Sequence, residues 1–350
     1  MWVYEEDIVV DNTNNKTRKL SELINETHQN PKYLPNVDLP HNIVATPDLK
    51  TACQDATLIV LVLPHQFLPT LLPTIRKHVH PSCRGVSLIK GLDYDADRAR
   101  PVLISKSIQQ SMQQSVPSFS CGVLMGANVA NEVAKGRMCE STLACQFQNS
   151  DNERTRLIFD SPPSFRVTRI ADVAGAEVCG ALKNVIALGA GFVDGCFGPS
   201  GGNTKAALLR VGLQEMGLFA TTFFQHADPS TTLWESCGVA DLITTCFGGR
   251  NRKCAQAFAE WQQTNGRNSS PSAQECQERW AKIERDLLNG QKLQGTLTAK
   301  EVFTTLEASG KLPMFPLMHT VYKIAFEGQP VSSIVNGIIV GPTSLPTARL

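Results

Sequence analysis

The sequence predicts an α/β fold over roughly the first half of the chain and an all-α fold over the second. Before about residue 170, short β-rich runs alternate with amphipathic or polar stretches, a pattern typical of parallel strands joined by helices. Beyond that point strand signals nearly vanish and segments of helical period take over. A chain of 350 residues is long enough for two cores, so we expect two domains, 1–170 and 171–350.

Five short runs are the predicted strands of the first domain. Residues 56–63, closed by Pro64, are continuously apolar and not alternating, which favours a strand buried on both faces. The other predicted strands lie at 85–91, 120–128, 142–145 and 165–168. Because ligands bind beyond the carboxyl ends of the strands in such a sheet, residues 64–67, 90–91 and 126–128 are expected to line a cleft.

Composition excludes several classes of protein. The formal charge is +1 from 33 basic and 32 acidic residues, which gives no field that would attract nucleic acid or a membrane surface. Eleven cysteines without a C-x-x-C pair favour a reducing compartment, and we expect no metal site. The longest apolar stretch, 56–63, is too short to span a bilayer.

The stretch 177–191 suggests a catalytic lysine. It places Lys183 among residues that are otherwise mostly small or apolar, and on a helix Gly180 and Ala187 would leave space beside it. A poorly solvated ammonium has a lowered pKa, which suits it to exchange a proton with a substrate hydroxyl near neutral pH. From this stretch alone, a lysine whose stem covers apolar surface while its head reaches water is an equal alternative.

A second polar stretch, 238–252, is typical of an anion site. Its two adjacent glycines let the backbone approach a ligand, Arg250 supplies a planar fork matched to phosphate, and Asn251 adds an amide. Asp241 and Thr244 are three residues apart, so on a helix both could face Lys183. A Gly-Gly turn with solvated arginines, and a capping or ion-paired Asp241, remain the structural alternatives.

The start of the chain lacks an expected motif. A Rossmann-type dinucleotide fold opens with a strand, a G-x-G-x-x-G turn and a helix, and no such turn is present. Residues 1–7 instead look like the end of a second Rossmann strand followed by Glu5, the acidic position that meets a ribose hydroxyl and favours NAD over NADP. The predicted sheet is therefore an N-terminally truncated, Rossmann-type parallel sheet.

With these residues in view, the chain resembles the eukaryotic NAD-dependent glycerol-3-phosphate dehydrogenases. The resemblance runs from Met1 to about Gly337, and its specific blocks are 63–67 (LPHQF), 87–91 (SLIKG), 124–128 (LMGAN), 177–184 (EVCGALKN), 235–246 (ESCGVADLITTC), 248–253 (GGRNRK) and 288–295 (LNGQKLQG). It implies a Rossmann domain followed by an all-α substrate and dimerisation domain, usually in a homodimer. The implied reaction interconverts dihydroxyacetone phosphate and sn-glycerol 3-phosphate with NAD.

The resemblance also implies a role for individual residues. It makes Lys183 the proton donor and acceptor. The implied substrate-binding residues are Lys90, Asn184, Asp241, Thr244, Arg250 and Asn251. The implied cofactor-binding residues are Tyr4, Phe67, Ala127, Arg250, Lys292 and Gln294.

The missing glycine turn leads to a further expectation. As written, the chain is expected to bind NAD weakly, and Met1 is expected to be an internal methionine of a longer protein. A catalytically impaired form or a non-catalytic partner subunit is the alternative function, and another lysine-dependent hydroxyacid or sugar-acid dehydrogenase is the rival enzyme.

The expected location is the cytoplasm, with the peroxisome as the alternative because Ala348, Arg349 and Leu350 resemble a variant of the S-K-L address.

Overall fold

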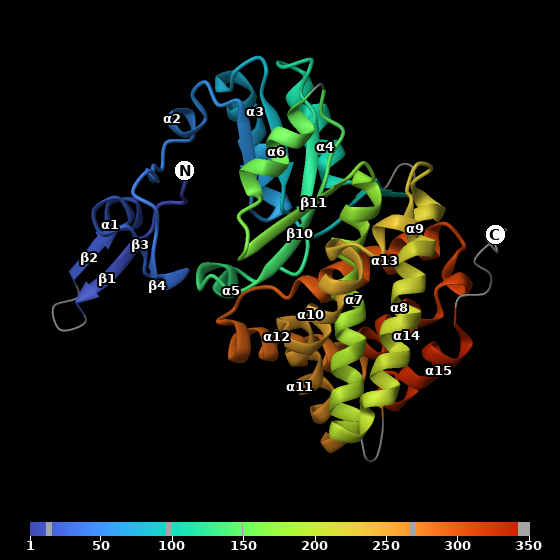
Figure 1. Cartoon of the computed structure of the whole chain (residues 1–350). Helices are drawn as coiled ribbons and strands as arrows, with labels where there is room; N and C mark the ends of the chain where they lie inside the picture. Colours follow the sequence, from blue (N-terminus) through green and yellow to red (C-terminus); the bar gives the residue numbers. More distant parts are fainter. Residues whose placement is uncertain (12–15, 96–99, 149, 266–269, 342–350) are drawn as a thin grey trace.

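The computed structural model describes residues 1–11, 16–95, 100–148, 150–265 and 270–341. These residues form an α/β half and a helical half, with a small N-terminal region beside the first (Figure 1). Among them, every strand ends by Ile170 and every later element is helical. The predicted order of an α/β fold followed by an all-α fold is confirmed.

A five-stranded sheet forms the centre of the α/β half, in the order β11-β10-β9-β6-β5. Its strands are β5 (Leu58–Leu61), β6 (Arg84–Ser87), β9 (Cys121–Met125), β10 (Cys139–Ala144) and β11 (Phe165–Ile170). Each falls in or overlaps a predicted run. The predicted Rossmann-type parallel sheet is confirmed, with the exception of one pair, since β10 runs antiparallel to β9. The connection 126–138 between them holds the short helix α5 (Ala130–Ala134).

Helices cover both faces of this sheet. On one face, Ile59 and Leu61 pack with Leu72 and Ile108, which lie on α3 and α4. On the other, Val86, Leu124 and Leu143 form a separate cluster beside Phe159 at the end of α6. The helices of this half are α2 (Leu49–Cys53), α3 (Leu68–His78), α4 (Ile104–Gln113) and α6 (Asp151–Phe159), and a hairpin of β7 (Asp93–Asp95) and β8 (Arg100–Val102) precedes α4.

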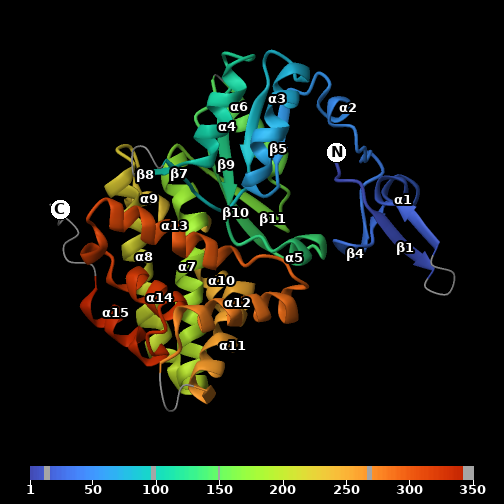
Figure 2. The same cartoon turned by 180° about the vertical axis from the view of Figure 1, so that it is seen from behind.

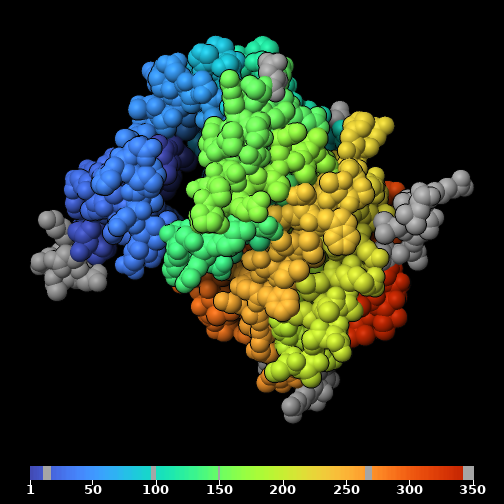
Figure 3. Space-filling view, viewed as in Figure 1, coloured from blue at the N-terminus to red at the C-terminus, as the bar shows by residue number. Residues whose placement is uncertain are grey.

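The N-terminal region, defined as residues 1–48, forms its own small unit apart from the sheet (Figures 1 and 2). Its core is Leu20, Ile24 and Ala45. In the space-filling view it is a separate blue lobe beside the green surface (Figure 3). Its elements are β1 (Asp7–Asp11), β2 (Lys16–Lys19), α1 (Leu20–Thr27), β3 (Gln29–Asn30) and β4 (Leu34–Asp38).

Residues 1–7, predicted to be the end of a second Rossmann strand, do not join the five-stranded sheet. Trp2 forms an isolated parallel bridge with Thr46, and Val3 N–H donates to the Thr46 carbonyl at 3.0 Å. In the doubly wound order 3-2-1-4, a second strand pairs with the first and not with the fourth. Within the described part of the chain β5 is the last strand on its side of the sheet, so this segment satisfies its backbone within the N-terminal region.

The helical half is organised around α7 (Val173–Phe197), which is buried from Gly175 to Val193. The helices that contact α7 include α8, α10, α11, α13 and α14. The apolar stretch 173–223 is long enough to span a membrane, but its most apolar window is wholly buried inside the fold, which marks it as a core element. The remaining helices are α8 (Gly202–Phe223), α9 (Pro229–Thr232), α10 (Asp241–Gly248), α11 (Arg250–Asn265), α12 (Ala273–Leu288), α13 (Gln294–Ala308), α14 (Pro316–Phe326) and α15 (Ile334–Val340).

Contacts at Gly180 and Glu177 help to join α7 to the α/β half. A Cβ on Gly180 would lie 2.7 Å from the Met125 sulfur of β9, so only glycine lets this strand end approach the helix so closely. Glu177 accepts hydrogen bonds from the Ser105 backbone N–H at 3.1 Å and from the Ser105 hydroxyl, at the start of α4. The open space predicted beside Lys183 at Gly180 is therefore filled by Met125.

Candidate active site

One buried carboxylate holds two lysines at the junction of the two halves. Lys183 of α7 is 4% exposed, and its ammonium donates to Oδ1 of Asp241, the first residue of α10. The Lys90 ammonium, which follows strand β6, donates to the other oxygen of Asp241 at 3.2 Å. Residues far apart in the sequence thus form a lysine–carboxylate–lysine cluster. Asp241 faces Lys183, as the sequence predicted.

The electrostatics of this cluster favour proton exchange. Burial, followed by the positive charge of Lys90, lowers the pKa of Lys183 to about 7, although the Asp241 carboxylate acts in the opposite direction. An amine with a pKa near neutrality exists in both protonation states at working pH, which is what a general acid and base requires. Lys183 is therefore buried and paired, so the alternative in which its head reaches water is wrong for this structure.

A chain of amide hydrogen bonds lies on the same part of α7. The Asn251 side-chain NH₂, on the first turn of α11, donates to the Asn184 side-chain oxygen at 2.8 Å. The Asn251 side-chain oxygen accepts from the Gly295 backbone N–H at 2.9 Å. A Cβ at Gly295 would lie 2.7 Å from that oxygen, so glycine is required there. Three helices, α7, α11 and α13, are tied together at the site.

Arg250 and Thr244 complete the predicted substrate side. Arg250 is exposed at the start of α11, and its guanidinium donates to the Gln291 side-chain oxygen at 3.0 Å. A guanidinium next to the free N–H groups of a helix N-terminus is suited to bind a phosphate. Thr244 lies one turn after Asp241 on α10 and is half-buried.

Residues predicted for the cofactor side lie at strand ends and in one loop. Phe67 ends the 3-10 turn that follows β5, and Ala127 N–H, just after β9, donates to the Ser236 hydroxyl at 3.2 Å. Gln294 opens α13, and a Cβ on Gly91 after β6 would lie 3.4 Å from its side-chain nitrogen. Lys292 donates to the Glu284 carboxylate at 2.8 Å.

Tyr4, also predicted for the cofactor side, lies apart from these residues. Tyr4 is 75% exposed and belongs to the N-terminal region, which stands apart from the sheet. Both carboxylate oxygens of Glu5 accept hydrogen bonds from Ser21, so Glu5 is engaged locally and not free for a ribose hydroxyl. The cause is the strand pairing described above: the segment satisfies its backbone with residues 44–47. In this structure Tyr4 and Glu5 therefore lie apart from the other residues predicted for the cofactor side.

Sequence reasoning missed several residues that hold the site. Ser236 contacts Ala127, Gln291 contacts Arg250, and Glu284 contacts Lys292. Ser236, Gln291 and Gly295 lie within the blocks 235–246 and 288–295 that carry the family resemblance. The resemblance did not imply a role for any of the three. Glu284 sits in the charged run 282–286 on α12 and resembles any solvated acid in the sequence.

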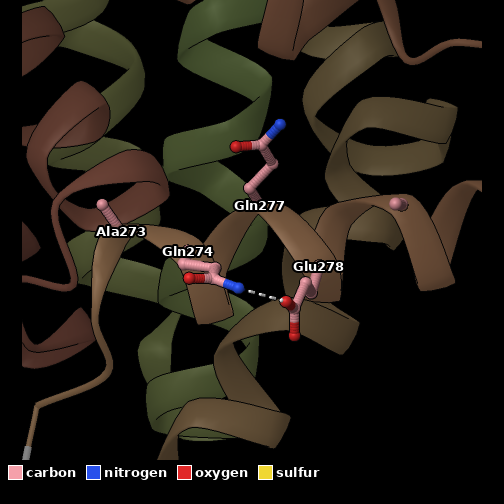
Figure 4. A pocket seen from close by; sticks show the side chains of 5 residues that line it. Ala273, Gln274, Gln277 and Glu278 are labelled. Atoms are coloured by element: carbon pink, nitrogen blue, oxygen red, sulfur yellow. Dashed lines mark hydrogen bonds between the residues drawn. The ribbon is translucent and has the colours of Figure 1, made fainter.

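A separate surface pocket along α12 does not have this chemistry. It is lined by Ala273, Gln274, Gln277, Glu278 and Ala281 (Figure 4). The single ionisable group in that lining is Glu278, which accepts from the Gln274 amide at 2.9 Å. The lining of this pocket contains no basic side chain to bind a phosphate, so catalysis is assigned to the lysine cluster.

Fold and site together define a class of protein. A sheet whose strand ends face a buried lysine–carboxylate cluster in a helical second domain is typical of a two-domain, nicotinamide-dependent oxidoreductase. Two family models match the chain: the NAD-dependent glycerol-3-phosphate dehydrogenase N-terminus over residues 1–151 and the corresponding C-terminus over residues 172–336.

Individual proteins give the same result. The chain is 44% identical over 338 residues to the human cytoplasmic glycerol-3-phosphate dehydrogenase [NAD(+)], covering 96% of this chain and 87% of that protein. The Saccharomyces cerevisiae glycerol-3-phosphate dehydrogenase structure superimposes with a TM-score of 0.80 at 40% identity, covering 97% of this chain and 89% of that chain. A Dunaliella salina structure gives 0.80 at 37% identity over 99% of this chain, which spans 55% of that longer chain. The chain belongs to the NAD-dependent glycerol-3-phosphate dehydrogenase family, as the resemblance predicted, and its cofactor is NAD.

Proposed function

We propose that this protein interconverts sn-glycerol 3-phosphate and dihydroxyacetone phosphate, with Lys183 as general acid and base. The observation that carries the proposal is the buried Lys183–Asp241–Lys90 cluster beside the Asn184–Asn251 pair and Arg250. The cluster suits proton transfer to a carbonyl oxygen, and the start of α11 suits a phosphate. A small phosphorylated ketone or alcohol needs both.

In the direction of ketone reduction, the chemistry that bound NADH would supply is hydride transfer to the carbonyl carbon. The Lys183 ammonium gives a proton to the carbonyl oxygen, becomes a neutral amine and later regains a proton from solvent. Asp241 holds the Lys183 amine in place through Oδ1 and holds Lys90 through Oδ2, so that a second positive charge stabilises the negative charge developing on the oxygen. Oxidation of the alcohol reverses each proton transfer.

The remaining predicted residues bind and orient the reactants. Arg250 and Asn251 would hold the phosphate, with Asn184 and Thr244 lining the rest of the substrate pocket. Fixing the phosphate positions the small substrate for reaction. On the cofactor side, Phe67, Ala127, Lys292 and Gln294 would contact the dinucleotide, and Arg250 would lie between the two ligands.

A substrate screen tests the proposal. NADH consumption with dihydroxyacetone phosphate is compared with consumption with unphosphorylated dihydroxyacetone and with keto acids. We expect a preference for the phosphorylated ketone of at least about tenfold in kcat/KM, since a charge-assisted hydrogen-bond set to phosphate is lost without it. Equal rates with the unphosphorylated ketone, or a preference for keto acids, would favour the rival hydroxyacid dehydrogenase.

Oligomeric state and location are part of the same proposal. A homodimer is implied by the family resemblance, and light scattering of the purified protein measures it directly. Relatives named cytoplasmic, such as the human and rat proteins, support a cytoplasmic location. The alternative address, Ala348, Arg349 and Leu350, lies outside the described residues. Imaging the protein with and without Leu350 separates the two locations.

A further inference from the structure

The loop between α12 and α13, residues 289–293, is held by one buried carboxylate. Glu284 lies on the last turns of α12 and is 7% exposed. Its Oε1 accepts from the Leu293 backbone N–H at 3.1 Å, and its Oε2 accepts from the Lys292 ammonium at 2.8 Å. Its own carbonyl accepts from the Gly290 backbone N–H at 3.0 Å. A single residue thus binds the loop at both ends.

The same loop touches the substrate side of the site. Gln291 contacts the Arg250 guanidinium, and Gly295, just after the loop, donates to Asn251. A shift of the loop therefore moves the groups proposed to hold the phosphate as well as Lys292 and Gln294 on the cofactor side. The loop therefore connects the residues proposed to bind the substrate with those proposed to bind the cofactor.

Lys292 has a choice of partners. Its side chain is 71% exposed while the Glu284 side chain is 9% exposed, so the ammonium lies at the surface and reaches inward to a buried charge. A lysine on a flexible four-carbon stem can turn from one anion to another. While the Lys292 ammonium is paired with Glu284, it attracts the phosphates of a dinucleotide less strongly. When the ammonium turns away from Glu284, it leaves a buried carboxylate without its positive partner, which costs free energy.

We propose that Glu284 is a positioning residue that sets the affinity for NAD: it fixes the loop through Leu293 and competes with the dinucleotide phosphates for Lys292. The inference rests on the proposed function only in placing Lys292 on the cofactor side. The two actions have opposite signs. The hydrogen bond to Leu293 favours cofactor binding, whereas the charge on Lys292 opposes it.

Two substitutions at this position separate the actions. Glu284→Gln keeps an oxygen for the Leu293 N–H and removes the charge, so we expect the Kd for NADH to fall about two- to fivefold, the scale of an exposed ion pair. Glu284→Ala removes both contacts, so we expect the Kd for NADH and the KM for dihydroxyacetone phosphate to rise. A purely structural role would weaken binding in both variants.

Direct titration of NADH fluorescence measures these Kd values without turnover, so failure of the proposed reaction would not affect them. In a Lys292→Met background, Glu284→Gln should have no effect on the Kd, because the contested ammonium is gone. Glu278→Gln makes the same change earlier on α12, at an exposed acid bound to Gln274, and should leave the Kd unchanged (Figure 4). The proposal is overturned if Glu284→Gln binds NADH no more tightly than the wild type, or binds more tightly in the Lys292→Met background as well.

Discussion

The helical half and the N-terminal region both contain residues that the motifs assigned to the site, but only one of them holds those residues in place. Lys183 and Asp241 lie in the large core built around α7 and are 4% and 2% exposed. Tyr4 is 75% exposed, in a unit whose core is three buried apolar residues. A motif fixes the identity of a residue, whereas packing of the surrounding elements fixes its position.

The first prediction tests the helical side of this comparison and has the largest expected effect. Lys183→Ala removes the proposed proton donor, so kcat for ketone reduction should fall about 10²- to 10⁴-fold, the usual contribution of general acid catalysis. Added ammonium or ethylamine should restore part of the rate to the variant. Steady-state kinetics with NADH measure both.

A buried lysine elsewhere in the same half is the control. Lys205 is 8% exposed and pairs with Asp194 at 2.8 Å. Lys205→Met should lower the melting temperature and leave the amine-dependent step in place, because Lys205 has no role in the cluster. A wild-type rate in Lys183→Ala would remove Lys183 from the mechanism.

The second prediction concerns the contact between the two halves. Burial raises the pKa of Glu177 from 4.5 to about 7, against the hydrogen bonds from Ser105. Because the folded-state pKa lies above the unfolded one, the carboxyl group contributes stability below about pH 4.5 and loses it as pH rises through about 7. Glu177→Gln cannot ionise, so its stability relative to the wild type should rise over this window, by at most about 3 kcal/mol.

Urea denaturation at a series of pH values measures this difference. Glu275→Gln on α12 is a suitable control with the opposite sign, because hydrogen bonds from Ser272 lower the pKa of that exposed carboxyl. A wild-type protein and a Glu177→Gln variant with parallel stability–pH curves would show that Glu177 does not titrate at the junction.

The third prediction tests the lysine cluster through pH. Reduction requires the protonated Lys183 amine, so kcat should fall as pH rises through its pKa of about 7. The positive charge of Lys90 helps to lower that pKa, so Lys90→Met should move the falling limb to higher pH while also slowing the reaction. A limb at the same pH in both proteins would show that the two ammonium groups do not interact. Lys106→Met, at an exposed position on α4, controls for loss of a surface charge.

The same comparison shows what the sequence could predict. All five strands of the sheet lie in or overlap predicted runs, and Lys183, Asp241 and Lys90 meet as their motifs indicated. These features depend on local apolar pattern and on a continuous core. The antiparallel β9–β10 pair and the position of Tyr4 depend instead on which strand is available as a neighbour, and no local pattern records that.

Glu284 was missed for a different reason. Its burial arises because the loop 289–293 folds back over the end of α12, and in the sequence it is one charge within a charged run. Long-range burial of a charged residue is visible only when the tertiary structure supplies its partners.

The last prediction has the smallest expected effect and concerns the N-terminal region. In this structure Tyr4 projects from a segment that pairs with residues 44–47, so Tyr4→Ala should change the Kd for NADH by no more than about twofold, as for other surface substitutions. Gln294→Ala, at the start of α13 beside Gly91, should weaken NADH binding more than Tyr4→Ala does. NADH fluorescence titration compares the two. A tenfold weakening by Tyr4→Ala would break the comparison, because it would require the N-terminal region to reach the sheet edge when the dinucleotide binds.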